Sequence, residues 1–304
     1  MIGILALDHF FDQVIHKLPG AFKIFYPDNL QQARSQIQGI MTTPWTKTDA
    51  LLIEKLPHLK IISCFGVGID STDAITAKKR GITITNTPDV VTDDTADIAM
   101  ALLLCLSRKI LFNDSYVRSG KWKIASAPLT SSLFGKTLGI VGLGKIGKAI
   151  AERAKTFGLK IIYHSKTKKD TSYRFYSNLI EMAKESDFLI ICCTGENKTR
   201  DIVNLNILQA LGKKGYLINI SRGMTVNEAD LIFALENNII AGAGLDVYLH
   251  EPHVPEQLIK MEQVVLLPHI GTATKETRNI MLNLVIDNIQ SFFKSGKALT
   301  PVNF

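Results

Sequence analysis

Three polar residues in the C-terminal third of the chain are of types that together could reduce a carbonyl group. They are Arg222, Glu251 and His269. The planar fork of donors on an arginine can pair with a substrate carboxylate and polarise an adjacent carbonyl. A histidine, whose ordinary pKa is about 6.5, can transfer a proton near neutral pH, and a neighbouring carboxylate favours its charged form. The set therefore predicts an oxidoreductase that delivers hydride to a 2-oxo acid and protonates its oxygen.

Each of these residues also has an ordinary structural interpretation. Arg222 could form a surface ion pair, Glu251 could be a solvated loop carboxylate, and His269, before Ile-Gly, could stand at the entry to a helix. Taken singly, these interpretations are favoured. The joint occurrence of the three residues behind a nucleotide-binding loop favours the catalytic interpretation.

That loop is glycine-rich and lies between an apolar strand pattern and a helical pattern. Gly142, Gly144 and Gly147 have the spacing of a dinucleotide-binding fingerprint. The first glycine allows a tight turn, the second lets the backbone approach a pyrophosphate, and the third lets the helix pack on the strand. Amides at the helix N-terminus add donors, so Lys145 and Ile146 are included in the predicted site.

The residues after the next predicted strand indicate which nicotinamide nucleotide is preferred. His164 occupies the place where an acidic residue would bind the ribose hydroxyls of NAD, and Ser165, Lys166 and Thr167 follow it. No carboxylate there would repel a 2′-phosphate, while the hydroxyls and the lysine offer donors and positive charge. We therefore predict NADPH as the cofactor, with NADH possible but weaker. The alternative is a solvated basic loop that does not discriminate between the two.

Apolar runs that alternate with helical patterns predict the elements that must position these residues. Strands are expected at residues 2–7, 21–25, 39–41, 59–65 and 82–85, and again at 137–141, 160–164, 188–193, 215–220, 241–247 and 264–267. This alternation predicts parallel sheets with helices on their faces, and the second set of six strands fits a doubly wound dinucleotide fold. Arg222, Glu251 and His269 each follow a strand, so all three should project from the carboxyl edge of one sheet.

The length of the chain predicts more than one domain. Beyond about 250 residues a single core tends to split, and this chain has 304. A helix from residue 92 toward Tyr116, stopped at Gly120, would bridge the domains, and a last helix at about 275–293 would return the chain to the first. We expect an α/β protein with two doubly wound parallel-sheet domains. A flavodoxin-like substrate-binding domain would comprise residues 1–98 plus 286–304, and a Rossmann nucleotide-binding domain residues 99–285.

Composition argues against several other classes of protein. No run approaches the roughly 18 apolar residues of a membrane helix, and the opening segment resembles a first strand more than a signal peptide, so a soluble, cytoplasmic protein is expected. The net charge of +7 comes from scattered lysines without interleaved aromatics, which argues against a nucleic-acid partner. The four cysteines lie in apolar stretches without metal-ligand spacing, so reduced thiols and no metal site are expected.

The chain resembles the D-isomer-specific 2-hydroxyacid dehydrogenase family over essentially its whole length. The matching segments, in the family's order, are residues 65–70, 86–88, 142–147, 219–223, 244–247 with Glu251-Pro252, and 268–271. The resemblance implies that Arg222 binds and polarises the substrate, that His269 is the acid/base, and that Glu251 orients it. It also implies that the backbone amides of Val67 and Gly68 bind the substrate carboxylate. Further cofactor contacts are implied at Cys193, Thr194, Thr199, Ile220, Asp246 and Gly271. A homodimer formed through the nucleotide domain is implied as well.

Within that family, residues 133–136, the 164–167 loop and residues 299–302 look most like NADPH-linked glyoxylate/hydroxypyruvate reductases. The resemblance implies reduction of such a small 2-oxo acid to the D-2-hydroxy acid. Two alternatives stay open: a reductase of a larger acid such as hydroxyphenylpyruvate, and a nucleotide-sensing, co-repressor-like binding protein. One departure is Gly195-Glu196-Asn197, where relatives often have proline, so a looser loop is expected there.

Overall fold

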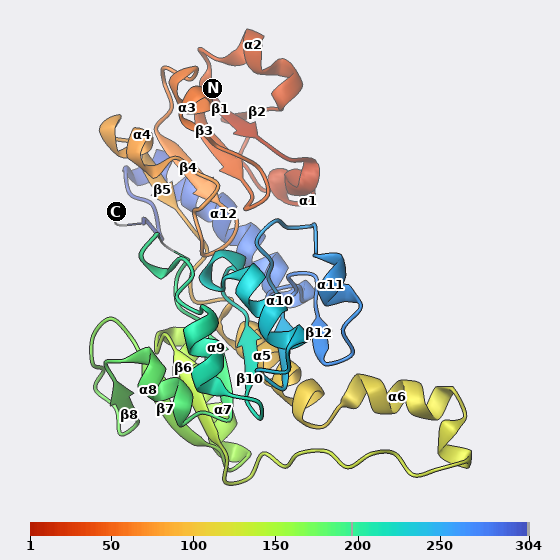
Figure 1. Cartoon of the computed structure of the whole chain (residues 1–304). Helices are drawn as coiled ribbons and strands as arrows, with labels where there is room; N and C mark the ends of the chain where they lie inside the picture. Colours follow the sequence, from red (N-terminus) through yellow and green to blue (C-terminus); the bar gives the residue numbers. More distant parts are fainter. Residues whose placement is uncertain (196, 303–304) are drawn as a thin grey trace. The chain divides into compact units, whose positions relative to one another are not determined.

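The computed structural model describes residues 1–195 and 197–302, and the chain divides into two compact units (Figure 1). The first unit comprises Met1–Val91 with Thr274–Phe304, and the second comprises Thr92–Ala273. The boundaries expected at 98/99 and 285/286 instead fall inside helices α5 (Thr92–Ser107) and α12 (Lys275–Ser295). A helix packs as one body, so the divisions come before these helices begin.

Within the described residues, the first unit builds a five-stranded parallel sheet in the order β2-β1-β3-β4-β5. This is the flavodoxin-like order, as expected. The strands are β1 (Ile2–Ala6), β2 (Phe22–Phe25), β3 (Ile37–Thr42), β4 (Ile61–Cys64) and β5 (Thr83–Thr85). The helices are α1 (Asp12–Ile15), α2 (Leu30–Ala33), α3 (Ala50–Glu54), α4 (Ala74–Lys79) and α12, with 3₁₀ turns η1 (His9–Phe11) and η2 (Pro27–Asn29).

The described part of the second unit builds a seven-stranded parallel sheet in the order β12-β11-β10-β9-β6-β7-β8. Its strands are β6 (Thr137–Val141), β7 (Lys160–His164), β8 (Arg174–Tyr176), β9 (Phe188–Ile191), β10 (Tyr216–Asn219), β11 (Gly242–Leu245) and β12 (Val264–Leu266). The six strands expected from the sequence omitted β8, the edge strand that completes the doubly wound order. Only three residues long, β8 is too short to give an alternation pattern.

The helices of the second unit connect these strands. They are α5, α6 (Ile110–Arg118), α7 (Lys145–Thr156), α8 (Leu179–Lys184), α9 (Leu205–Leu211), α10 (Glu228–Glu236) and α11 (Glu256–Ile259), with 3₁₀ turns η3 (Lys121–Lys123), η4 (Asn197–Thr199) and η5 (Gly223–Thr225).

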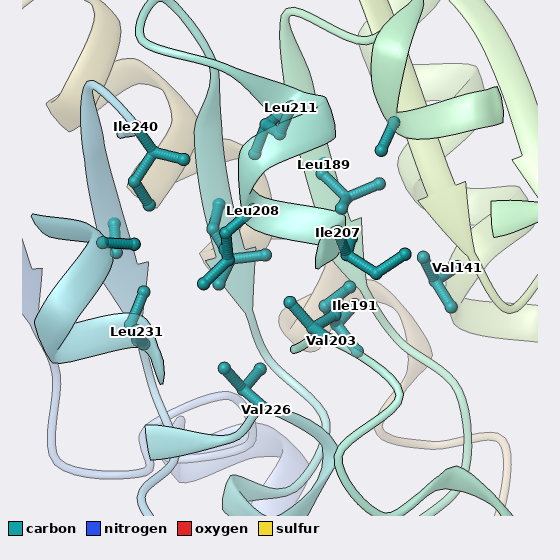
Figure 2. Packing of buried hydrophobic residues seen from close by; sticks show 14 of the residues in the cluster. Val141, Leu189, Ile191, Val203, Ile207, Leu208, Leu211, Val226, Leu231 and Ile240 are labelled. Atoms are coloured by element: carbon teal, nitrogen blue, oxygen red, sulfur yellow. The ribbon is translucent and has the colours of Figure 1, made fainter. Parts of the chain in front are cut away.

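Both faces of this second sheet are buried. One face packs Val141, Leu189 and Ile191 against Ile207 and Leu208 of α9, as Figure 2 shows. The other face packs on α5 and α7 in a separate apolar cluster. Every residue of β9 and β11 is buried, which explains why these strands have no polar alternation in the sequence.

The helix expected to run from residue 92 toward Tyr116 is two helices. Lys109, between α5 and α6, has φ 48° and ψ 47°, a left-handed conformation that no helix interior contains. The side-chain amide of Asn113 donates through Nδ2 to the carbonyls of Arg108 and Lys109, at 3.1 and 3.0 Å. It thereby pairs backbone carbonyl groups at the break between the two helices. As a result α6 and the segment up to residue 135 project away from the sheet of their own unit (Figure 1).

None of the helices in the described part of the chain is long and apolar enough to cross a membrane. The four cysteines all lie within the described residues, and none forms a disulfide.

Candidate active site

The second unit gathers most of the predicted site residues at one edge of its sheet. Because all its strands are parallel, the loops that follow them leave from the same edge. Gly142 follows β6, Cys193 follows β9, Arg222 follows β10, Asp246 follows β11, and His269 follows β12.

His269 and Glu251 form a hydrogen-bonded pair at this edge. His269 Nδ1 lies 2.7 Å from Glu251 Oε2, while Glu251 Oε1 accepts a 3.0 Å bond from the amide of Tyr248. A carboxylate oxygen can only accept, so Nδ1 carries the proton of this bond and Nε2 takes no part in the pair. Burial raises the pKa of Glu251, but the hydrogen bond and charge of His269, helped by the Tyr248 amide and the charge of Arg222, outweigh it and lower that pKa. Glu251 is therefore an anion at neutral pH.

Asp246 holds the backbone that carries the histidine. Its Oδ1 and Oδ2 accept bonds of 2.7 and 2.8 Å from the amides of Ile270 and Gly271. His269 itself has φ 53°, a strained left-handed conformation for a residue with a side chain. Asp246 is only 1% exposed, and this burial raises its pKa in spite of the two amides. We infer that its carboxylate fixes the turn after His269, whatever it also contributes to a cofactor.

Arg222 lies in a loop organised by Asn219, which the sequence reading named only as part of a motif. Asn219 Nδ2 donates to the backbone carbonyl of Arg222 (3.1 Å), and Asn219 Oδ1 accepts from the backbone amide of Ser221 (3.1 Å). At Gly223 a Cβ would lie 2.0 Å from the carbonyl of Tyr248, so only glycine lets this loop approach the loop of Glu251. That approach accounts for the influence of Arg222 on the pKa of Glu251.

Gly195, noted as a departure from the family, packs directly against Arg222. A Cβ at Gly195 would lie 2.5 Å from Cγ and 2.9 Å from Cβ of Arg222. The missing side chain therefore makes room for the arginine, a reason that no local sequence pattern shows. Glu196 of the same segment lies outside the described residues.

The glycine-rich loop has the close approaches that its fingerprint predicted. Gly142 has φ 102°, and a Cβ there would lie 2.7 Å from the amide nitrogen of Cys193. At Gly147 a Cβ would lie 2.2 Å from the carbonyl oxygen of Gly142. At Gly144, in contrast, a Cβ would meet nothing within 4 Å, and this residue caps α7 without a side-chain hydrogen bond. The open face before Lys145 and Ile146 fits a phosphate group on the helix N-terminus.

The loop predicted to recognise the 2′-phosphate is held by hydrogen bonds to its own backbone and to β8. His164 Nδ1 donates to the carbonyl of Tyr176 (2.9 Å), and Ser165 Oγ donates to the carbonyl of Thr167 (2.7 Å), while Lys166 is exposed. The hydroxyl of buried Tyr163 accepts from the amide of Lys169 (2.8 Å). Sequence reasoning saw Tyr163 only as a strand residue and missed this anchor.

The remaining predicted cofactor residues lie near this edge. Thr199 donates through its hydroxyl to the carbonyl of Thr194 (2.6 Å), which joins the two predicted residues. Ile220 is buried, and Gly271 lies against Asp246 and Thr95.

Val67 and Gly68 belong to the first unit, in the loop after β4. Gly66, with φ 122°, donates its amide to Thr87 Oγ1 (2.9 Å) and accepts from the Thr87 amide (2.8 Å). Asn86 Nδ2 donates to the carbonyl of Val67 (2.8 Å). The amides of Val67 and Gly68 donate to no acceptor within residues 1–195 and 197–302. The loop thus presents two rigid donors of the kind that binds a carboxylate.

Comparison with known proteins identifies the family. Residues 100–271 match the family described as D-isomer specific 2-hydroxyacid dehydrogenase, NAD binding domain. The chain belongs to the D-isomer-specific 2-hydroxyacid dehydrogenase family. Glyoxylate/hydroxypyruvate reductase A of Arabidopsis thaliana is 47% identical to this dehydrogenase over 90% of this chain and 88% of its own. The hydroxyphenylpyruvate reductase of Plectranthus scutellarioides is 43% identical over 99% of both chains.

Solved structures agree with this assignment. The NADPH-dependent glyoxylate/hydroxypyruvate reductase of Sinorhizobium meliloti, determined with NADP and malonate, superposes with a TM-score of 0.92 at 40% identity. The superposition covers 99% of this chain and 96% of that one. The expected two-sheet α/β fold of this dehydrogenase is thereby confirmed.

Proposed function

We propose that this dehydrogenase reduces glyoxylate or hydroxypyruvate to the D-2-hydroxy acid with NADPH. The observation that carries the proposal is the hydrogen bond of 2.7 Å between His269 Nδ1 and Glu251 Oε2. The charge of Arg222 also lowers the pKa of the Glu251 carboxyl, so all three residues interact. The names of the Arabidopsis and Sinorhizobium relatives support the choice of substrate.

The residues divide the chemistry among them. A bound nicotinamide supplies the hydride. Arg222 pairs with the substrate carboxylate and draws electron density from the 2-oxo group. His269 gives the proton on Nε2 to the substrate oxygen as it becomes an alkoxide, and Glu251 stabilises the charged ring before transfer and fixes its orientation. The backbone amides of Val67 and Gly68 would bind the substrate carboxylate as well.

The cofactor is proposed to bind the second unit along the sheet edge. Its pyrophosphate would meet the residues from Gly142 to Gly147, and Lys166 would attract a 2′-phosphate, which supports NADPH over NADH. The first unit would bind the substrate. The other proposed cofactor contacts are His164, Ser165, Thr167, Cys193, Thr194, Thr199, Ile220, Asp246 and Gly271.

A homodimer in the cytoplasm completes the proposal. Segment 110–129 projects from its unit (Figure 1). It exposes apolar side chains, including Leu111 at 56% and Ile124 at 87%. Apolar surface of this kind is typical of a protein contact, and a second copy is the occupant that we propose. Four cysteines without disulfides suit a reducing compartment.

The test is initial-rate oxidation of NADPH and NADH against glyoxylate, hydroxypyruvate and pyruvate. We expect turnover of glyoxylate or hydroxypyruvate with a preference for NADPH. His269→Ala should lower kcat by about a hundredfold or more, the usual size of an acid/base contribution, while NADPH binding stays unchanged. Turnover in that variant equal to the parent would remove the acid role, and no turnover in the parent with any acid would overturn the proposal.

A further inference from the structure

Tyr248, which follows β11, contacts the loops of both Arg222 and Glu251. Its backbone amide donates to Glu251 Oε1 (3.0 Å). A Cβ at Gly223, the residue after Arg222, would lie 2.0 Å from the carbonyl carbon and oxygen of Tyr248. The backbone of this one residue therefore packs against the arginine loop and holds one oxygen of the carboxylate.

The side chain of Tyr248 reaches the segment that carries His269. Its hydroxyl lies 2.9 Å from the carbonyl oxygen of Leu267 and 3.2 Å from that of Leu245, and it donates its hydrogen to these two acceptors. Leu245 ends β11, and Leu267 stands two residues before His269. The hydroxyl thus joins the carboxyl ends of β11 and β12 close to the point where the histidine leaves the sheet.

The environment of Tyr248 keeps it a fixed donor. The residue is only 7% exposed. This burial, together with the charges of Asp246 and Glu251, raises the pKa of Tyr248 to about 12. The hydroxyl therefore keeps its hydrogen near neutral pH.

Packing alone does not fix the imidazole of His269. Its side chain is 44% exposed, and a cavity of about 250 Å³ adjoins it, with Tyr248, Pro252 and Leu267 in its lining. A ring with open space beside it stays in a productive orientation only if hydrogen bonds and the backbone restrain it. Here the restraints are the bond to Glu251 and the backbone that runs from Leu267 to the histidine, and Tyr248 is bonded to both.

We propose that Tyr248 is a positioning residue for proton transfer, whose hydroxyl keeps the imidazole of His269 aligned with the Glu251 carboxylate. This inference rests on the proposed reductase function. Tyr248 acts through the His269–Glu251 pair and transfers no proton itself. A catalytic group misplaced by about 1 Å can cost about a hundredfold in rate, so loss of one restraint should lower kcat measurably.

The test replaces Tyr248 by phenylalanine in the full-length protein, which keeps the ring and removes only the hydroxyl. With NADPH and glyoxylate or hydroxypyruvate, kcat per NADPH-binding site should fall about tenfold. KM for the acid and Kd for NADPH should stay within about twofold of wild type, because other residues bind both molecules. Tyr216→Phe removes a tyrosine hydroxyl at the amino end of β10, the opposite edge of the same sheet, and is the matched control that should alter none of these values.

A double-mutant cycle with Glu251→Gln separates positioning from a general loss of structure. If the hydroxyl acts through the pair, Tyr248→Phe should lower kcat by less than about twofold in a protein that already carries Glu251→Gln. A further tenfold loss in that background would overturn the inference, as would an unchanged kcat in Tyr248→Phe or an equal loss in Tyr216→Phe.

A Tyr248→Phe protein that no longer binds NADPH would overturn the inference as well, because the hydroxyl would then hold the whole unit and not the pair. Wild type inactive on both glyoxylate and hydroxypyruvate would instead refute the proposed function.

Discussion

Asp246 and His269 are linked through the backbone and not through their side chains. The Asp246 carboxylate binds the amides of the two residues after His269, at 2.7 and 2.8 Å, where His269 has φ 53°. The buried carboxylate of Asp246, which follows β11, thus holds His269 in a strained turn after the neighbouring strand β12. This arrangement leaves the imidazole a fixed direction before any substrate binds.

Glu251→Gln should change how stability depends on pH. The folded pKa of Glu251 lies below its ordinary value of 4.5, so the pair stabilises the protein above that pH and loses this contribution as the pH falls through the lowered pKa. The midpoint of thermal unfolding should therefore be lower in the variant than in wild type near pH 6, and the two should converge in acid. Glu256→Gln, at an exposed ion pair on α11, is the control with little expected effect. A difference that is constant with pH would contradict the ion-pair account.

The same Glu251→Gln variant should reduce glyoxylate more slowly. Glutamine keeps the shape of the side chain but supplies no negative charge beside the imidazole that donates the proton. Initial rates at about pH 7 should therefore give a kcat about tenfold or more below that of wild type, while NADPH binding stays unchanged. A kcat equal to that of wild type would mean that the charge of Glu251 does not assist the histidine.

Gly144→Ala and Gly147→Ala should affect different properties, NADPH binding in the first variant and stability in the second. A Cβ at Gly147 would lie 2.2 Å from the Gly142 oxygen, so this variant should unfold at a clearly lower temperature. A Cβ at Gly144 would have open space, so that variant should keep its stability but weaken NADPH binding by about tenfold or more, because the added methyl occupies the path of the phosphates. Fluorescence titration with NADPH and thermal denaturation separate the two. Unchanged NADPH affinity in Gly144→Ala would place the nucleotide elsewhere.

Lys166→Asp should weaken NADPH more than NADH. The exposed Lys166 follows β7 in the predicted 2′-phosphate loop, and an aspartate there would repel the phosphate. Lys160→Asp, at the exposed opposite end of β7, makes the same charge change and controls for net charge. The kcat/KM for NADPH divided by that for NADH should fall in Lys166→Asp and stay unchanged in Lys160→Asp. A ratio that falls equally in both variants would mean that the loop contributes only to the overall positive charge and does not recognise the 2′-phosphate.

Leu111→Asp combined with Ile124→Asp should give a monomer. The apolar segment 110–129 would no longer bury against a second copy once charges replace these exposed side chains. Wild type should sediment at about twice the 33.6 kDa chain mass and the double variant at the chain mass. Ile75→Asp, on the first unit, should leave the mass unchanged. A wild type that sediments as a monomer would refute the proposed dimer.

The sequence by itself determined the features that depend on local pattern. Strands such as β6 and β7 were located to the residue because an apolar run buried on both faces is visible without knowledge of its neighbours. The glycine fingerprint and the order of Arg222, Glu251 and His269 behind strand ends likewise follow from chain order and parallel strands.

Only the tertiary structure decided the features that depend on contacts between distant segments. The edge strand β8 exists because β7 offers it a hydrogen-bonding partner, and the break at Lys109 is completed by the side chain of Asn113. Gly195 and Gly223 matter because other loops approach them closely, and Asp246 because the residues after His269 return to it. Such roles depend on atoms a few ångströms apart in space but up to tens of residues apart in the chain, and no local propensity encodes that proximity.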